Sequence, residues 1–383
     1  MQMSRAIDVP VTPSVLQWVI DDSGYDFDEI AQAAGVDSEI LRQWVTAKGH
    51  PTITQARKLA AKVHRPFATL FLPRPPQRPR PSVDFRHPSD VQRSLNANER
   101  RYLRRAARLQ DSLAWLSGEM RIPGPSTPAA SIDQNPATVA AEIRSHLGIS
   151  TQQQKRWATT SQAFDNWRVA LEQTGYLVFL FSLGKNSCSG FSIWNDSAPV
   201  IAVNTAWNES ARIFTLFHEF GHLLTRTDSA CLESRRTSGR VDPIERWCER
   251  FAAELLMPDR DLLATLRERG WRPGTHITDL NTASHVARLY KVSLRAAVIQ
   301  LIELNATTWN LYDEIPPLSD YKPFGGGGRG RDRTQIREDQ LGERTTALLV
   351  AGVERDVISR SQAVDLLDIP DVRFDEISSR HPR

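Results

Sequence analysis

One stretch of the sequence, residues 214–224, constrains the chain more than any other. It reads as a single helix in which His218 and His222 are four positions apart, so both lie on the same face, one turn from each other. Two imidazoles placed in this way can bind one zinc ion, which needs two or three more ligands. Glu219, next to the first histidine, can act on a metal-bound water without ligating the metal itself.

The surrounding residues predict that this helix is buried. Apolar side chains wrap most of it, namely Ile213, Leu216, Phe217, Phe220, Leu223 and Leu224. Two histidines and a glutamate on a buried helix must be hydrogen-bonded or coordinated, because burying them without partners is costly. The motif has only three fixed positions and can arise by chance, so the alternative is a pair of surface histidines. The apolar surroundings favour metal coordination.

Length and composition indicate a multidomain globular protein. The chain has 383 residues and 40% hydrophobic content, enough for two or three domains with cores of their own. Its formal charge of +3 is unevenly placed, since the segment from Arg57 to Arg108 carries fourteen Lys and Arg residues against Asp84, Asp90 and Glu99. Any contact with nucleic acid is therefore expected in the N-terminal third.

Cysteine usage and hydropathy indicate the cytoplasm. Cys188, Cys231 and Cys248 show no C-x-x-C spacing, which fits structural thiols in a reducing compartment. The N-terminus has no apolar core of signal-peptide length, and no run of apolar residues is long enough to span a bilayer. We expect a protein that is neither secreted nor embedded in a membrane.

The N-terminal segment predicts a bundle of short helices separated by Gly or Pro. The expected helices cover residues 13–21, 27–34, 38–46, 53–63 and 66–71. Ala31 and the turn Gly35-Val36 stand where a helix-turn-helix needs close helix contact and a tight bend. Residues 27–44, followed by 51–60, resemble the Xre-type helix-turn-helix family.

Two readings of this bundle stay open. If it reads DNA, its second motif helix would present Ser38, Glu39, Arg42 and Gln43 to the major groove. Only Arg42 on that helix is cationic, and Glu39 is a poor neighbour for a phosphate. The same bundle can instead dock a protein.

A stiff connector and a long basic helix follow the bundle. Five prolines between Pro73 and Pro81 favour an extended chain. Residues 96–118 then predict an amphipathic helix, whose apolar side would comprise Leu103, Ala107, Leu109 or Leu113, and Leu116. Its arginines can contact phosphates or form a solvated face; they are Arg100, Arg101, Arg104, Arg105 and Arg108.

The middle of the chain changes from a helical to a strand-like period. Helices are expected at residues 136–147 and 162–174, and strands at 176–181, 190–194 and 199–203. We predict a three-stranded antiparallel sheet immediately before the histidine-bearing helix. An exposed edge strand of such a sheet can pair with an extended substrate backbone, although the sheet can also be scaffold alone.

A second helix, expected from Pro243 to Met257, offers the missing metal ligand. Glu245 and Glu249 are four positions apart, so both can face the histidine-bearing helix. One carboxylate can ligate zinc while the other holds a histidine N–H.

On two stretches, residues 214–224 and 251–258, the sequence resembles the ImmA/IrrE family of metallopeptidases. The resemblance extends upstream to the Xre-like bundle and Asp84-Phe85-Arg86, and downstream through residues 289–293 and 358–367. It implies that His218 and His222 are zinc ligands, that Glu219 is the general base, and that Glu245 is the third ligand. The chain departs from the family pattern because Cys248 replaces an Ala and Glu249 replaces an Asn. We assign Glu245 to the metal and Glu249 to holding a histidine, with Glu249 as the alternative ligand.

The predicted fold class is α+β, with a zincin-like peptidase domain between helical segments. The expected parts are a helix-turn-helix bundle (1–73), a Pro/Arg-rich linker (74–95), the metallopeptidase domain (96–310), a flexible Gly/Arg-rich linker (311–338) and a C-terminal helical segment (339–383). In the last segment, helices are expected at residues 339–354 and 361–367.

The resemblance implies a cytosolic Zn²⁺-dependent endopeptidase whose substrate is a helix-turn-helix repressor, so that cleavage relieves repression. Two alternatives stay open. The protein can be a DNA-binding regulator whose metal site is structural or sensory, or a toxin-like component of a toxin–antitoxin pair.

Overall fold

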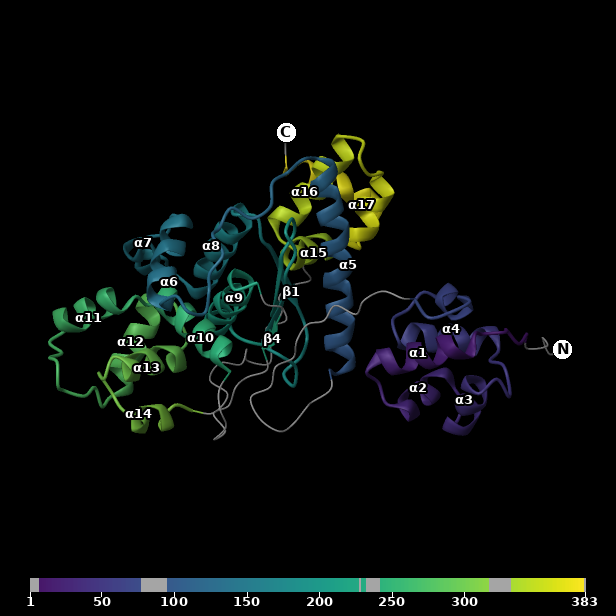
Figure 1. Ribbon diagram of the computed structural model, residues 1–383, viewed down its shortest axis with the longest axis horizontal. Coiled ribbons are helices and arrows are strands. Elements are labelled where there is room, and N and C mark those ends of the chain that lie inside the picture. Colours follow the sequence, from purple (N-terminus) through teal and green to yellow (C-terminus); the bar gives the residue numbers. More distant parts are fainter. Residues whose placement is uncertain (1–6, 77–94, 227–228, 232–241, 317–331, 382–383) are drawn as a thin grey trace. The chain divides into compact units, whose positions relative to one another are not determined.

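The computed structural model describes residues 7–76, 95–226, 229–231, 242–316 and 332–381, and it divides the chain into two compact units. The first unit comprises Met1–Ser82 and Gln92–Arg105, and the second comprises Val83–Val91 and Ala106–Arg383. The boundary falls within the long helix α5 (Ala97–Glu119), drawn in blue in Figure 1. The predicted domain limits at residues 73, 95, 310 and 338 stay predictions.

The first unit contains the predicted short helices. They are α1 (Pro13–Ser23), α2 (Phe27–Ala34), α3 (Ser38–Val45), α4 (Ile53–Lys62) and the 3-10 helix η1 (Phe67–Phe71). Local capping sets two of the starts: Asp37 accepts from the Ile40 N–H at 2.9 Å, and Thr52 and Gln55 form a capping box. The apolar faces of the helices meet in one core around Leu16 and Ile30. The last element, expected as a short helix at residues 66–71, is a 3-10 helix.

The N-terminal half of α5 uses two of its arginines inside the first unit. Arg104 Nη1 donates to the backbone oxygen of Asp22 at 2.9 Å and pairs with its carboxylate at 3.0 Å, and Arg100 Nη1 donates to the backbone oxygen of Asp21 at 3.3 Å. These contacts give two of the arginines a structural role. The sequence alone allowed this basic face either to contact phosphates or to face solvent. The expected burial of Ala107 is wrong: Ala106 is buried, because it continues the three- and four-residue spacing of Leu103 and Leu113.

The second unit contains a four-stranded mixed sheet in the order β1-β3-β2-β4. Its strands are β1 (Leu177–Phe181), β2 (Gly190–Ile193), β3 (Val200–Asn204) and β4 (Ser229–Cys231). The predicted antiparallel three-stranded sheet is wrong on two counts. β1 runs parallel to β3, because β3 inserts between β1 and β2, and a fourth strand follows the histidine-bearing helix. Strand periodicity predicts which residues extend but not which strands pair.

Helices pack against this sheet and against one another. α8 (Thr160–Gln173) and α9 (Glu209–Leu224) lie side by side, and α9 packs across β2 and β3. α10 (Pro243–Leu256) packs on α9 and on α6 (Pro136–His146). Buried aromatic rings fill the layer, with Phe217 edge-on to Trp167 at 4.9 Å between centroids. The α+β class is confirmed.

The remaining helices of the second unit form two groups, with α11 to α14 on the left of Figure 1 and α15 to α17 at its upper right. They are α7 (Thr151–Arg156), α11 (Asp259–Glu268), α12 (Leu280–Tyr290), α13 (Leu294–Glu303), α14 (Trp309–Asp313), α15 (Arg333–Leu341), α16 (Glu343–Glu354), α17 (Arg360–Leu367), η2 (Asp371–Arg373) and α18 (Phe374–Ser378). The single helix expected at 339–354 is divided at Gly342, where Glu172 of α8 accepts from the Arg344 N–H at 3.2 Å. Most of the predicted 311–338 linker, and residues 77–81 of the Pro-rich connector, lie outside the described residues.

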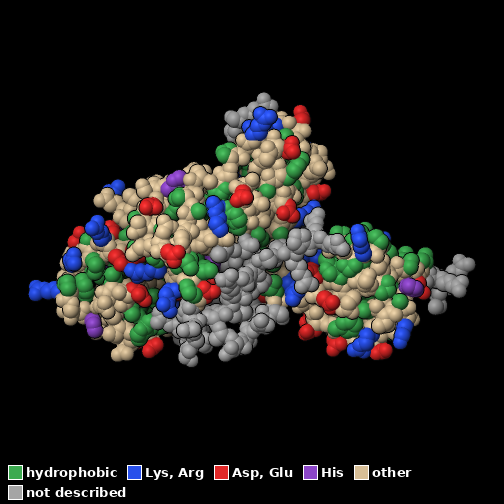
Figure 2. Space-filling view, viewed as in Figure 1, with side chains coloured by type: hydrophobic (Ala, Val, Ile, Leu, Met, Phe, Trp, Pro, Cys, Tyr) green, Lys and Arg blue, Asp and Glu red, His purple; other side chains and the backbone are tan. Residues whose placement is uncertain are grey.

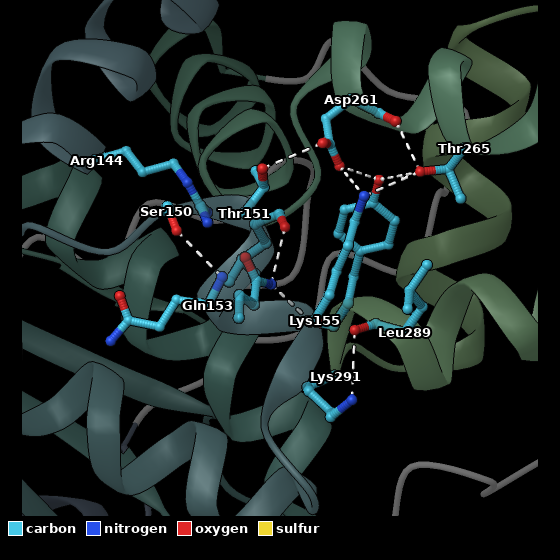
Figure 3. A network of polar contacts seen from close by, with 12 residues as sticks. Arg144, Ser150, Thr151, Gln153, Lys155, Asp261, Thr265, Leu289 and Lys291 are labelled. Atoms are coloured by element: carbon cyan, nitrogen blue, oxygen red, sulfur yellow. Dashed lines mark hydrogen bonds and ion pairs between the residues drawn. The ribbon is translucent and has the colours of Figure 1, made fainter.

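A polar network links α7, α11 and α12 (Figure 3). We call Lys155, Asp261, Thr265 and Tyr290 the Asp261 network. Asp261 accepts from Tyr290 and from Lys155, while Lys155 Nζ donates to Thr265 Oγ1 at 3.0 Å. Thr151 Oγ1 adds a hydrogen bond to Asp261 at 3.1 Å. Every member of the network therefore has a complementary partner.

Surface charge and helix hydropathy bear on the predicted partners. On the face that Figure 2 shows, acidic and basic side chains of the described residues are interspersed. None of the helices in the described ranges is long and apolar enough to cross a membrane.

Candidate metal centre

Helix α9 carries three of the predicted site residues in a buried position. It begins at Glu209, directly after Asn208, whose side chain caps the helix by accepting from the Ala211 N–H at 2.9 Å. The apolar residues around its circumference bury it against the sheet and α10, as the sequence predicted. Only 6% of His218, 2% of His222 and none of Glu219 is exposed.

A glycine lets α10 approach α9 closely enough to deliver a third side chain. A Cβ added at Gly221 would lie 3.1 Å from Cys248 Sγ and 3.3 Å from its Cα, so a larger residue would push the helices apart. α10 begins at Pro243, with Asp242 accepting from the Ile244 N–H at 2.8 Å. Glu245 in the first turn of α10 therefore reaches the histidines.

The three side chains converge with the spacing of ligands around a tetrahedral ion. His218 Nε2 lies 3.2 Å from His222 Nε2 and 3.1 Å from Glu245 Oε2, and His222 Nε2 lies 3.3 Å from Glu245 Oε1. Ligand atoms about 2.0–2.1 Å from a tetrahedral zinc ion are roughly 3.3–3.4 Å apart. We call His218, His222 and Glu245 the metal cluster, and its donor set and spacing fit zinc. Among the described residues it is the one group of three or more His, Cys, Asp or Glu side chains with this convergence.

The pKa values of the residues in the metal cluster agree with this geometry. Burial alone would lower the pKa of His218, but the hydrogen bond to Glu245 and the charges of Glu245, Glu219 and Glu249 outweigh it and raise that pKa. Burial alone would raise the pKa of Glu245, but the two histidines lower it well below its usual range. The cluster thus concentrates negative charge that favours a cation.

The fourth predicted residue, Glu219, lies beside the cluster and is not one of its three ligands. Its Oε2 accepts a hydrogen bond from Ser192 Oγ at 2.9 Å, in a contact that is fully buried on both sides. Our sequence reasoning assigned no role to Ser192. The sequence feature that could have pointed to Ser192 is a small polar residue, two positions after a glycine, in an otherwise apolar strand.

Glu249 lies one turn beyond Glu245 on α10 and is not a member of the cluster. Its charge nevertheless acts on His218, whose pKa it helps to raise. The geometry therefore favours Glu245 as the third ligand, while the assignment of Glu249 to holding a histidine stays a prediction.

The residues predicted to contact DNA lie on α3 in the first unit, and two of them have partners within it. Ser38 Oγ donates to the Asp28 carboxylate. Arg42 pairs with Glu39 at 2.9 Å, and its guanidinium lies 5.6 Å from the centre of the Phe27 ring. Gln43 is exposed. DNA contact by these three residues stays a prediction.

A surface hollow of about 450 Å³ lies elsewhere in the second unit. Residues of α6, the turn after it and the end of α10 line it, among them Arg144 and Glu254. No member of the metal cluster lines this hollow. The candidate chemistry therefore rests on the convergent side chains and not on the hollow.

Two of the three cysteines can be placed. Cys188 and Cys248 are buried and free of disulfides, and burial raises the pKa of the Cys248 thiol well above its usual value. Both behave as the structural thiols that the sequence predicted. The side chain of Cys231 lies outside the described part.

Comparison with known families identifies the segment that contains this centre. Residues 171–301 match the family model described as the IrrE N-terminal-like domain, Peptidase_M78. The match runs from the end of α8 into α13 and includes the sheet, α9, α10 and the whole metal cluster. Comparisons with curated proteins and with solved structures give no match.

The family match and the metal cluster within it together indicate a metallopeptidase-type domain. More specifically, the chain contains an IrrE N-terminal-like metallopeptidase domain with a candidate His-His-Glu metal site. The family match does not extend to the N-terminal bundle that was predicted to be a helix-turn-helix.

Proposed function

We propose that the protein is a zinc-dependent endopeptidase. The observation that carries this proposal is the convergence of His218, His222 and Glu245 at ligand spacing, inside a segment that matches a peptidase family. Glu219 stands next to this cluster without belonging to it, which is the position required of a general base.

The residues divide the work of hydrolysis between them. His218, His222 and Glu245 would hold zinc, which supplies a Lewis acid and makes a bound water more acidic. The Glu219 carboxylate accepts a proton from the attacking water and delivers it to the nitrogen of the leaving amine. One water is added across the C–N bond, and Glu219 returns to its starting state.

The sheet suggests where the substrate chain lies. Among the described strands, β4 has a strand partner on one side only, β2, whereas α15 packs against β1 at the other edge. We place an extended substrate segment along β4, where backbone hydrogen bonds would hold it independently of its sequence. Such binding suits a protein substrate.

The substrate class follows from the family resemblance. We propose a helix-turn-helix repressor in the cytoplasm, whose cleavage relieves repression. This part of the proposal rests on the resemblance and not on a contact in the structure.

The test compares wild type with Glu219→Gln, which keeps the size of the side chain and removes the base. We expect both proteins to bind one zinc ion, and the variant to cleave a helix-turn-helix repressor about 10²- to 10⁴-fold more slowly. Mass spectrometry of the cleavage products and metal analysis of the full-length proteins provide the readouts.

Glu268→Gln is the matched control, because Glu268 is exposed on α11. It should cleave at the wild-type rate. Equal cleavage by Glu219→Gln would contradict the proposed mechanism, and zinc binding without any cleavage by wild type would favour a structural or sensory metal site.

A further inference from the structure

We propose that Ser192 is a positioning residue that holds the Glu219 carboxylate in place for proton transfer. This inference rests on the proposed peptidase function and deepens it. Its basis is the buried hydrogen bond from Ser192 Oγ to Glu219 Oε2, 2.9 Å long, between strand β2 and helix α9.

The local sequence of β2 explains how this contact arises. Side chains alternate across a strand, so Gly190 and Ser192 face the same way. A Cβ at Gly190 would lie 2.6 Å from Thr215 Cγ2 and 3.3 Å from Glu219 Cγ, so this face of β2 touches α9 directly. The absent side chain at 190 and the short one at 192 let the helix lie close enough for the hydrogen bond.

The strand that carries Ser192 is itself held in place. Ser192 pairs with Ile201 in the antiparallel ladder between β2 and β3, and it is fully buried. Gln110 of α5 donates from Nε2 to the backbone oxygen of Ile193 at 2.9 Å, and to that of Ala198 at 3.1 Å. A hydroxyl on such a strand is a fixed donor, because neither its backbone nor its environment can move readily.

The hydrogen bond from Ser192 limits the rotation of the Glu219 carboxylate. A glutamate side chain has several soft torsions, and a base that must be reoriented at each turnover loses rate. The hydrogen bond from Ser192 restricts these torsions and leaves the metal cluster untouched. Removing it should therefore lower kcat and spare both substrate binding and zinc binding.

The main experiment measures Ser192→Ala in the full-length protein. A hydrogen bond to a charged group contributes about 1.5–3 kcal/mol, which corresponds to about a 10- to 160-fold loss of kcat. KM should stay within about twofold and zinc at one equivalent, since the substituted atom touches neither. Ser192→Thr restores the hydroxyl and should recover most of the lost rate.

Ser117→Ala is the matched control for truncating a buried serine. Ser117 is 1% exposed, and its hydroxyl has no hydrogen-bond partner among the described residues. It should leave kcat unchanged. An unchanged kcat in Ser192→Ala, or a loss no larger than in Ser117→Ala, would overturn the proposal, whether or not Ser192→Thr folds.

A second readout needs no activity. If Ser192 and Glu219 are coupled, Ser192→Ala should lower the melting temperature by a few degrees in wild type and by clearly less in a Glu219→Ala background. If Ser192→Ala lowers the melting temperature equally in both backgrounds, Ser192 and Glu219 are not coupled. A protein that cleaves nothing but shows coupled shifts would instead contradict the proposed function and leave the Ser192–Glu219 contact standing.

Discussion

Two polar clusters of the second unit are each built around a carboxylate but differ in how their atoms face one another. In the Asp261 network, the carboxylate accepts from the Lys155 ammonium and the Tyr290 hydroxyl, and also from the hydroxyl of the neighbouring Thr151. Donors and acceptors are therefore matched. In the metal cluster, two imidazole nitrogens and a carboxylate turn their ligand atoms to a common point. The first arrangement is complete by itself, whereas the second has the geometry of a candidate cation site.

The pKa values of the two carboxylates do not separate the clusters, because the pKa of Glu245 and that of Asp261 are both lowered. Burial alone would raise the pKa of Asp261, but the hydrogen bonds from Lys155 and Tyr290 lower it overall. Burial together with Asp261 raises the pKa of Tyr290, which keeps that hydroxyl a donor. Hydrogen-bond donors that are matched to acceptors stabilise the fold, whereas lone pairs that converge on one point can bind an ion.

The largest expected effect concerns the third ligand. Glu245→Gln should weaken zinc binding by more than 100-fold, because it removes a ligand, whereas Glu249→Gln should weaken it by about tenfold or less. Competition with a chelator of known affinity measures both. Comparable losses in the two variants would mean that Glu249 shares the metal, and a larger loss in Glu249→Gln would reverse the assignment.

A moderate effect is expected from breaking the Asp261 network. Asp261→Ala leaves Lys155 and Tyr290 without their shared acceptor and should lower the free energy of unfolding by about 1–3 kcal/mol. Urea unfolding monitored by circular dichroism checks this value. Zinc content should not change, and a loss of zinc in Asp261→Ala would remove the distinction between the two clusters.

An effect that appears only as the pH is changed concerns Glu254, a buried carboxylate of α10 that belongs to neither cluster. Burial and the neighbouring Asp259 raise its pKa to about 7, although Arg250 lies 2.6 Å from it. Its folded-state pKa exceeds the unfolded value, so its contribution to stability is present below about pH 4.3 and is lost as the pH rises through about 7.

Glu254→Gln stays neutral throughout this range and should remove that decline. We expect the difference in unfolding free energy between the variant and wild type to grow by about 2–3 kcal/mol from pH 5 to pH 8. Urea unfolding at several pH values measures it, with the exposed Glu268→Gln as control. Parallel pH profiles for wild type and Glu254→Gln would show that Glu254 ionises normally.

The helical part of the fold and the ligands on α9 could be predicted from local sequence. The spacing of His218 and His222 and the apolar residues around them specify both the helix and its burial, because these depend on residues within two turns. Capping residues such as Asp37 and Asn208 mark helix starts in the same local way.

The sheet and the hydrogen bond to the base could not be predicted, because they depend on contacts between distant residues. Nothing in residues 176–204 specifies that β3 inserts between β1 and β2. Ser192 and Glu219 are 27 positions apart, and only the packing of β2 on α9 brings them together. The preference for Glu245 over Glu249 came from a resemblance, and the geometry of α10 then supplied a physical reason for it.

The most direct test of the metal centre is a crystal structure of the full-length protein with zinc, with anomalous data collected at the zinc absorption edge. We predict one strong peak about 2.0–2.2 Å from His218 Nε2, His222 Nε2 and a carboxylate oxygen of Glu245. The three side chains hydrogen-bonded to one another with no peak between them, or a peak bound by Glu249 in place of Glu245, would contradict the account.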